Sequence, residues 1–233
     1  MKRHPAATPA KITFITGTDT GVGKTTLTGL LLAHLRGQGV RALAMKPFCT
    51  GPRNDAEMLQ ALQHEELTVE EVNPFYYRKP LAPLAAATRE GQLVSCEAVI
   101  EHIHAAAQCC EHLLVEGVGG VLVPLGDGYS VADLIERLGC DVIVVSRNQL
   151  GTLNHTLLSL EALAARQVKR LKLVLVAQCK PDASAVSNSR VLKSLIGGIP
   201  LISLENLVGF NGTPAEFNHA RKKLKKTLAR ILE

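Results

Sequence analysis

Apolar residues in this chain gather into two kinds of segment that alternate along its length. Short continuous runs rich in Val, Ile and Leu are typical of buried strands, and longer runs with apolar residues three or four positions apart are typical of helices. The strand-like segments are 11–16, 41–46, 113–116, 141–146, 171–177 and 200–204. The helix-like segments are 23–36, 54–63, 96–110, 131–138, 153–167, 185–195 and 214–233. This alternation predicts an α/β fold, a three-layer sandwich in which helices flank a mostly parallel central sheet.

Local signals refine the ends of several segments. Ser95 and Ser130 directly precede helix-like segments, where serine is a preferred N-terminal cap. Thr-Pro-Ala-Glu at 213–216 has the pattern of a capping box with proline at the first helical position. The stretch 65–92 contains three prolines and no clear period, so we predict that it is irregular.

The chain carries no internal repeat, low-complexity tract or linker that would divide it. We therefore predict a single domain over residues 11–233. Residues 1–10 are polar and rich in Pro and Ala, and they lack the apolar core of a secretory signal. They are interpreted as a flexible N-terminal arm.

Composition removes several classes of protein from consideration. Apolar residues make up 46% of the chain and aromatic residues only 3%, so the core is expected to be aliphatic. No apolar run is long enough to span a membrane. The net charge of +5 comes from residues 219–233, which hold six basic residues and one acidic residue (6 − 1 = 5). Because no aromatic residues accompany them, we interpret this tail as a solvated helix face, with neither a nucleic-acid nor a membrane partner.

The six cysteines form no Cys-x-x-Cys pair and show no spacing typical of a zinc site or a disulfide framework. They are expected to be reduced and mostly buried, as in a cytoplasmic protein.

The segment 16–26 joins the first predicted strand to the first predicted helix. It is Thr-Gly-Thr-Asp-Thr-Gly-Val-Gly-Lys-Thr-Thr, which is typical of a phosphate-binding loop. Backbone N–H groups at the helix N-terminus face the anion, Lys24 adds a positive charge, and the Thr25 hydroxyl suits Mg²⁺. Five residues separate Gly17 from Gly23, one more than in the usual motif. The loop indicates a P-loop NTPase-like fold with an altered spacing.

Other polar residues follow predicted strands, whose carboxyl ends share one edge of a parallel sheet. Glu116 suits Mg²⁺ directly or through water, although a strand-end carboxylate can also simply face solvent. Asp55 could be an ordinary carboxylate at a helix N-terminus. Lys46 could be a surface lysine or a second cation for a transferring phosphoryl group. The glycines at 117, 119 and 120 would let backbone approach a ligand closely.

Taken together, these segments resemble the dethiobiotin synthetase family. The resemblance rests on the loop 17–25, on Lys-Pro-x-x-Thr-Gly at 46–51, on Asp55, on Val-Glu-Gly-x-Gly-Gly-x-x-x-Pro-Leu at 115–125, and on Leu-Gly-Thr-Leu-Asn-His at 150–155. The motifs have the family's order and spacing from about residue 12 to about 177. The resemblance implies a ligase that uses ATP, Mg²⁺ and CO₂ to close the ureido ring of dethiobiotin on 7,8-diaminononanoate, through a carbamate and a carbamic-phosphoric anhydride.

The resemblance also implies roles for individual residues. Lys24, Lys46 and Thr20 would be catalytic, and Thr25, Asp55 and Glu116 would hold Mg²⁺. The nucleotide would contact Asp19, Thr20, Gly21, Val22, Gly23, Lys24, Thr25, Thr26, Glu116 and Gln178. The substrate would contact Lys46, Thr50, Gly117, Val118, Gly119, Gly120, Gly151, Thr152 and Asn154. A homodimer with its active site at the interface is implied as well, because 150–154 would reach the partner's substrate carboxylate.

Two positions of the predicted nucleotide site depart from the usual pattern of the family, and two other classes of protein were compared with the sequence. Many family members have glutamate at position 21, although glycine also occurs there, and the adenine contact is usually an asparagine where this chain has Gln178. The sequence therefore does not determine which nucleotide base the site prefers. A MinD/ParA-type regulatory ATPase shares the loop ending, but Asp19 stands where that class has its signature lysine. A cobyrinate-type ligase would need a glutaminase domain, for which 233 residues leave no room.

Overall fold

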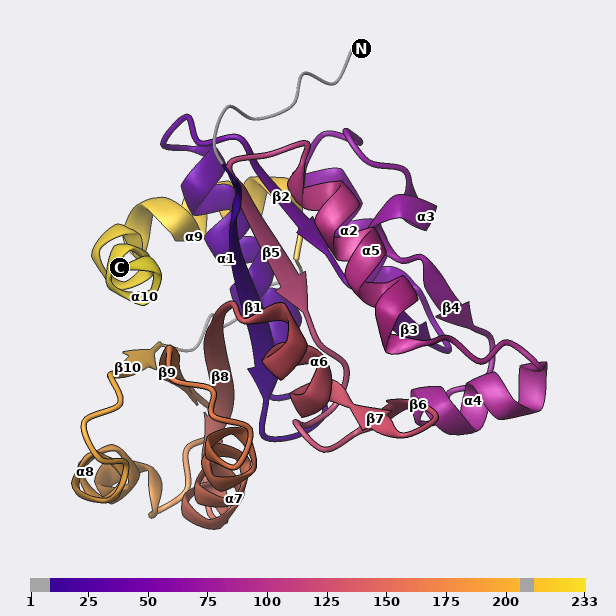
Figure 1. The fold of residues 1–233 in the computed structure, drawn as a ribbon. Coiled ribbons are helices and arrows are strands. Elements are labelled where there is room, and N and C mark those ends of the chain that lie inside the picture. The colour runs from indigo at the N-terminus through magenta and orange to yellow at the C-terminus, as the bar shows by residue number, and fades with distance from the viewer. Residues whose placement is uncertain (1–8, 206–211) are drawn as a thin grey trace.

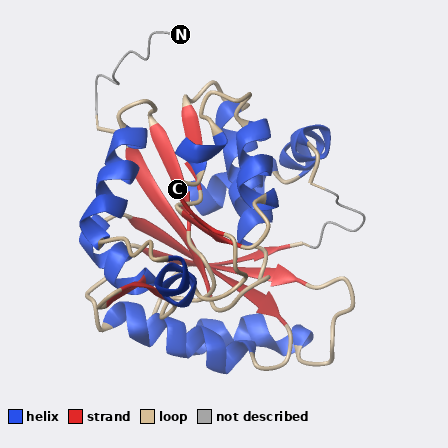
Figure 2. Ribbon diagram, turned by 90° about the vertical axis from the view of Figure 1, so that its right-hand side faces the viewer, coloured by secondary structure: helices blue, strands red, loops and turns tan. Residues whose placement is uncertain are grey.

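In the computed structural model, residues 9–205 and 212–233 are described, so most of the expected N-terminal arm lies outside the described residues. The central sheet has six strands in the order β10-β9-β8-β1-β5-β2, and every neighbouring pair is parallel (Figures 1 and 2). The strands are β1 Lys11–Gly17, β2 Ala42–Met45, β5 His112–Glu116, β8 Asp141–Asn148, β9 Leu171–Ala177 and β10 Leu201–Leu204. The six predicted strands and the parallel arrangement are confirmed.

Helices cover both faces of this sheet (Figure 1). One layer contains α1, α9 (Pro214–Lys223) and α10 (Lys225–Leu232), which pack against one another. The opposite layer contains α5 (Cys96–Ala107), α6 (Val131–Leu138) and α7 (Thr152–Ala164). The predicted helices are α1 Lys24–Arg36, α2 Asn54–Leu62, α5 Cys96–Ala107, α6 Val131–Leu138, α7 Thr152–Ala164 and α8 Ala185–Leu195. Ser95 caps α5 as expected, because its side chain accepts a hydrogen bond from the Ala98 N–H.

The prediction that 65–92 is irregular is wrong. This stretch contains α3 Val69–Val72, β4 Phe75–Tyr77 and α4 Pro83–Glu90, and β4 pairs with the short strand β3 Phe48–Thr50. Pro83 occupies the first turn of α4, where its missing N–H has no helical partner to lose. The prolines therefore separate short elements instead of abolishing them. A second small sheet joins β6 Pro124–Gly126 to β7 Tyr129–Ser130.

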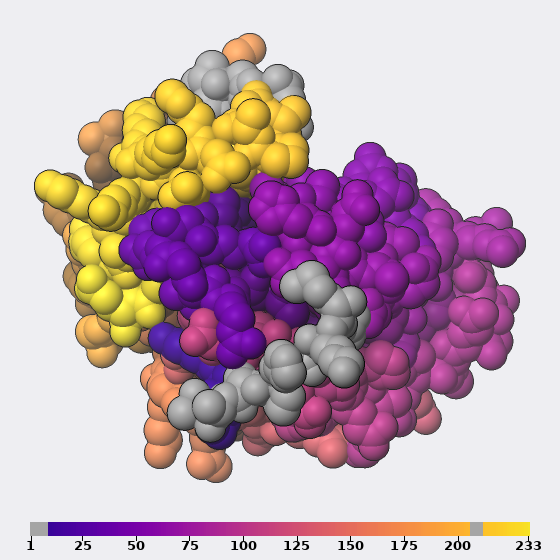
Figure 3. All heavy atoms as spheres, turned by 90° about the horizontal axis from the view of Figure 1, so that it is seen from above, coloured from indigo at the N-terminus to yellow at the C-terminus, as the bar shows by residue number. Residues whose placement is uncertain are grey.

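The predicted C-terminal helix is divided into α9 Pro214–Lys223 and α10 Lys225–Leu232, and the capping box at Thr213 is present. The two helices meet at Leu224. Both pack against α1, and the C-terminal segment lies beside the N-terminal part of the chain in the space-filling view (Figure 3). Phe217, Leu228 and Ile231 are buried. The break lets each half turn its apolar side chains toward the core.

The six cysteines all lie in the described part of the chain, none of them is in a disulfide, and four are buried. Within residues 9–205 and 212–233, no helix combines the length and the apolarity that crossing a bilayer requires.

The contact between α1 and α9 predicts an unusual response to a helix-favouring substitution. A Cβ added to Gly29 would lie 2.5 Å from the ring of Phe217, which is fully buried. Alanine normally stabilises a helix relative to glycine by about 1 kcal/mol, but forced overpacking costs roughly 1–3 kcal/mol. We expect Gly29→Ala to lower the free energy of unfolding, measured by urea denaturation, by about 1 kcal/mol.

Gly37→Ala is the matched control on the same helix. Its Cβ would meet only the end of the Arg221 side chain, which can turn away. The free energy of unfolding should then stay within about 0.5 kcal/mol of the wild type. Equal stabilisation by both alanines would contradict tight packing between α1 and α9.

A buried histidine predicts how stability depends on pH. His112 is 6% exposed, and its Nε2 lies 2.8 Å from Thr13 Oγ1. Burial, together with Lys11, lowers its pKa from 6.5 to about 4. The unfolded chain therefore binds a proton in this range more readily than the folded one, so stability is full above pH ~6.5 and falls as the pH drops toward about 4. Between pH 7 and pH 5 the loss should be about 2 kcal/mol.

His112→Gln keeps a group that can bond Thr13 but cannot titrate. Urea denaturation at pH 7 and pH 5 should show that this variant lacks the histidine's share of the pH dependence. An unchanged difference between the two pH values would assign the effect to other groups.

Candidate active site

The phosphate loop lies at the carboxyl edge of the sheet, between β1 and α1 (Figure 1). Gly23 has a φ of 103°, a conformation that L side chains rarely adopt, and α1 begins at the next residue. The first turn of α1 has no acidic side chain. The partial positive charge of the helix N-terminus is therefore available to an anion.

Lys24 is buried and joins two loops. Its Nζ donates hydrogen bonds to the carbonyl oxygens of Asp19 and Gly119, both at 2.8 Å. Burial lowers the pKa of Lys24 to about 8, with Glu116 opposing the shift and Lys46 adding to it. The ammonium group thus links the phosphate loop to the glycine-rich loop that follows β5.

Glu116 is the centre of the polar cluster. Its side chain is fully buried, and Oε1 accepts hydrogen bonds from Lys46 Nζ at 2.6 Å and from Thr25 Oγ1 at 2.7 Å. Lys46 Nζ also contacts Asp55 Oδ2 at 2.7 Å. Burial disfavours the ammonium form, but the two carboxylates more than offset this and raise the pKa of Lys46. Lys46 is therefore a fixed positive charge between two negative ones.

The cluster has the chemistry of a magnesium site. Glu116 Oε2 is buried and has no hydrogen-bond partner among residues 9–205 and 212–233, which is costly unless another group binds it. Mg²⁺ prefers oxygen ligands and commonly uses one or two carboxylates together with substrate phosphates. Thr25, Asp55 and Glu116 supply a hydroxyl and two carboxylates beside the phosphate loop, so these residues could hold the ion.

A cavity of about 430 Å³ opens over this cluster. That volume is within the usual range for small-molecule sites. The predicted residues that line it are Thr20, Gly21, Gly23, Lys24, Thr25, Thr26, Lys46, Thr50, Asp55, Glu116, Val118 and Gly119. Cys49 and Pro52 also line it and were not predicted. Burial raises the pKa of Cys49 to about 12, so its thiol is not a ready nucleophile.

Other predicted residues lie outside this cavity. Thr152 and Gly151 begin α7, and the Thr152 hydroxyl bonds to Ser146 Oγ at 2.7 Å. Thr152, Asp19 and Val22 line a second cavity of about 40 Å³. Asn154 is exposed and lines neither cavity.

Three further predicted residues, Gly117, Gly120 and Gln178, line neither of these two cavities. Gly117 N–H donates to the Ile15 carbonyl at 2.9 Å, and a Cβ on Gly120 would lie 3.2 Å from the Thr18 carbonyl oxygen. Both glycines therefore pack against the phosphate-loop side of the sheet. Gln178 follows β9, and its Nε2 donates to the Val176 carbonyl at 3.1 Å.

Sequence reasoning missed Arg147, near the end of β8. Its guanidinium donates to the carbonyl oxygens of Thr20 at 2.9 Å and Gly21 at 3.2 Å, so it holds the outer side of the phosphate loop. The available signal was a cation at the end of a strand whose carboxyl end faces the loop.

The parallel sheet and the loop before α1 define a class of protein, the phosphate-loop ATPases. Two solved structures share the fold: MinD of Aquifex aeolicus (TM-score 0.59, 16% identity, 96% of this chain and 97% of that chain) and a ParA family ATPase of Chlorobium tepidum (TM-score 0.56, 15% identity, 94% and 96%). At these identities the likeness concerns the fold alone. A family model described as AAA domain matches residues 11–206.

Sequence relatives narrow the class to one family. ATP-dependent dethiobiotin synthetase BioD of Anaeromyxobacter sp. (strain Fw109-5) is 42% identical over 199 residues, covering 83% of this chain and 89% of the relative. The enzyme of the same name from Bacillus licheniformis is 35% identical over 215 residues, covering 90% and 91%. The chain belongs to the dethiobiotin synthetase family of ATP-dependent ligases.

The buried ion pair between Lys46 and Glu116 predicts an effect on stability that can be measured without an activity assay. Lys46→Met leaves the Glu116 carboxylate buried without its cation, which should lower the free energy of unfolding by about 3 kcal/mol. Adding Glu116→Gln removes the buried charge, so the double variant should recover most of the loss. Urea denaturation at neutral pH measures both.

Lys11→Met is the control, because the Lys11–Asp141 pair is exposed (3.2 Å, side chains 44% and 31% exposed). It should cost under about 1 kcal/mol. If the Glu116→Gln change deepens the loss caused by Lys46→Met, the two side chains do not act as a charge pair.

Proposed function

We propose that this protein synthesises dethiobiotin from 7,8-diaminononanoate, CO₂ and ATP, releasing ADP and phosphate. Membership of the dethiobiotin synthetase family supports this reaction. The observation that carries the proposal is the buried Glu116–Lys46 pair, which contacts Thr25 of the phosphate loop and Asp55 in one cavity. A phosphate loop alone binds a nucleotide. A second buried lysine beside it suits an anionic acceptor of the phosphoryl group.

In the first step one amine nitrogen attacks the carbon of CO₂ and loses a proton, which forms a carbamate. A carbamate oxygen then attacks the terminal phosphorus of ATP, and the bond from phosphorus to the ADP oxygen breaks. Finally the second amine attacks the carbamoyl carbon, phosphate leaves, and the ring closes with loss of a proton. The phosphoryl transfer brings an anionic carbamate against an anionic triphosphate, so neutralisation and positioning would supply most of the rate of this step.

The proposed roles follow from where the charges lie. Lys24 would neutralise the terminal phosphates, and Lys46 would hold the carbamate against the phosphorus. Thr20 and Thr50 line the same cavity and would contact the carbamate or the diamine. The nucleotide would lie along the loop 19–26. Its base contact at Gln178 stays a prediction.

Magnesium is part of the proposal. The unpartnered Glu116 Oε2 supports an ion held by Thr25, Asp55 and Glu116. When bound, Mg²⁺ would offset the negative charge of the phosphates during transfer. Lys46, which bonds both carboxylates, would keep their mutual repulsion low.

A homodimer is also proposed. Leu150 is 80% exposed at the start of the turn into α7, next to Gly151 and Thr152. These residues and Asn154 lie outside the large cavity of their own chain. Both observations support a role for 150–154 at the substrate carboxylate of the partner subunit. The loop 117–120 would lie beside the substrate, and its Val118 and Gly119 line the large cavity. The absence of a disulfide among the six cysteines, all of them described, agrees with the proposed cytoplasmic location.

The function has a direct test. With Mg²⁺ and ATP, the wild type should release ADP only when both 7,8-diaminononanoate and bicarbonate are present. Lys24→Ala should reduce this release by about 100-fold or more, because it removes a charge aimed at the transferring group. Lys222→Ala, an exposed lysine of α9, should leave the rate within about twofold.

Circular dichroism should show that each variant is folded. ADP release that does not depend on the diamine would refute the synthetase reaction and favour a regulatory ATPase.

A further inference from the structure

A side chain with no assigned role lies behind Lys46. Asn73 follows α3 and is 1% exposed. Its Nδ2 donates hydrogen bonds to the carbonyl oxygens of Lys46 at 3.0 Å and Pro47 at 3.1 Å. The Lys46 N–H in turn donates to the Val72 carbonyl at 2.8 Å. The backbone that carries the Lys46 side chain is therefore held on both its N–H and its C=O sides by the segment that precedes β4.

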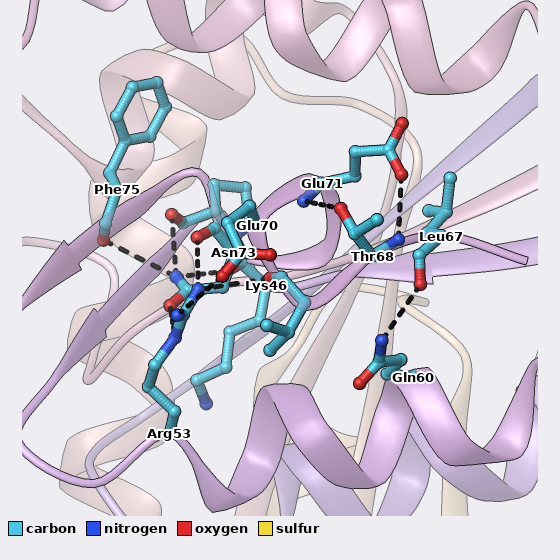
Figure 4. Close-up of polar contacts among 11 residues, drawn as sticks. Lys46, Arg53, Gln60, Leu67, Thr68, Glu70, Glu71, Asn73 and Phe75 are labelled. Atoms are coloured by element: carbon cyan, nitrogen blue, oxygen red, sulfur yellow. Dashed lines mark hydrogen bonds and ion pairs between the residues drawn. The ribbon is translucent and has the colours of Figure 1, made fainter. Parts of the chain in front are cut away.

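Arg53 continues this chain of contacts (Figure 4). Its Nε donates to Asn73 Oδ1 at 3.1 Å, and its Nη2 donates to the carbonyl oxygens of Asn73 at 3.0 Å and Val69 at 3.2 Å. The guanidinium carbon also lies 4.7 Å from the centre of the Tyr76 ring. A planar, delocalised cation suits such a combination of forked hydrogen bonds and stacking.

The two residues connect both partners of the Lys46–Asp55 pair. Arg53 is the N-terminal cap residue of α2, and Asp55 is the second residue of that helix. Asn73 fixes the backbone of Lys46 on one side and accepts a hydrogen bond from Arg53 on the other. The 2.7 Å contact between Lys46 Nζ and Asp55 Oδ2 closes these links into a ring.

We propose that Asn73 and Arg53 are positioning residues that set the relative placement of Lys46 and Asp55, an inference that rests on the proposed function. Neither residue lines the large cavity, so each acts through the side chain it holds. Substitution of a residue that orients a metal-binding or catalytic group commonly lowers metal affinity or activity ten- to a hundred-fold. The competing explanation is that Asn73 only satisfies two buried carbonyls.

Arg53→Lys tests the proposal first, because it keeps the charge but loses the planar fork. We expect kcat to fall by about tenfold, while KM for ATP stays within about twofold, because the phosphate loop belongs to β1 and α1. Asn73→Asp is a second variant of nearly equal volume that lacks the two N–H donors. Asn73→Asp should likewise lower kcat while the KM for ATP stays within about twofold of the wild type.

Gln60→Ala is the matched control. Gln60 lies on α2, and its Nε2 donates to the Leu67 carbonyl at 3.3 Å, a contact that does not lead to Lys46 (Figure 4). This variant should lose some thermal stability and keep kcat within about twofold.

A binding measurement tests the positioning role of Arg53 and Asn73 independently of the proposed reaction. The rise in Tm on adding ADP, with and without MgCl₂, reports nucleotide and magnesium binding without turnover. The Mg²⁺ concentration that gives half of the magnesium-dependent rise should increase about tenfold in Arg53→Lys, while the rise with ADP alone stays unchanged.

If Arg53→Lys and Asn73→Asp lower Tm but match the wild type in kcat and in magnesium requirement, the residues are structural only and the proposal is overturned. If instead the wild type releases no ADP in response to the diamine, the proposed function fails, and the magnesium measurement still decides the positioning role.

Discussion

The site depends on the buried charge of Glu116. A carboxylate at the end of a central strand is stable only if cations and hydrogen-bond donors surround it, and Lys46 and Thr25 supply them. The parallel register explains why these partners are close. Met45, the last residue of β2, pairs with Val115, so Lys46 follows β2 beside Glu116. Ile15 pairs with Glu116 from the other side, just before the phosphate loop. The register therefore brings three strand ends together, and the buried carboxylate is stabilised by the groups found there.

The same sheet serves proteins of different activity. MinD and ParA share the fold at 15–16% identity, so the layers, the strand order and the loop before α1 do not by themselves define a reaction. The features of this chain that support the proposed reaction are the second lysine, Lys46, and the carboxylate of Asp55 on α2. The two lysines of the site have different surroundings. Burial among backbone carbonyls lowers the pKa of Lys24 to about 8, whereas the two carboxylates raise the pKa of Lys46.

Segments far from the cavity contribute to the site through packing. The break between α9 and α10 lets the C-terminal helices bury their apolar side chains, and Phe217 packs directly over Gly29 of the nucleotide-side helix. The segment with α3 and β4 supports the opposite side of the cavity, where β4 pairs with the strand that carries Thr50. Loss of order in either segment would shift α1 or Lys46 without touching a ligand.

The sequence by itself determined the six strands, the main helices and the residues of the phosphate loop, because these depend on local hydrophobic period, capping residues and glycine placement. It also determined the family through the spacing of its motifs. Only the tertiary structure decided the strand order, the ring from Lys46 through Asn73 and Arg53 to Asp55, and the placement of Arg147 over the loop. Such contacts join residues up to 127 positions apart. They depend on which strands become neighbours, and no local pattern encodes that choice. The stretch 65–92 was misjudged for the same reason, since its short elements are stabilised by β3 and Lys46 more than by their own period.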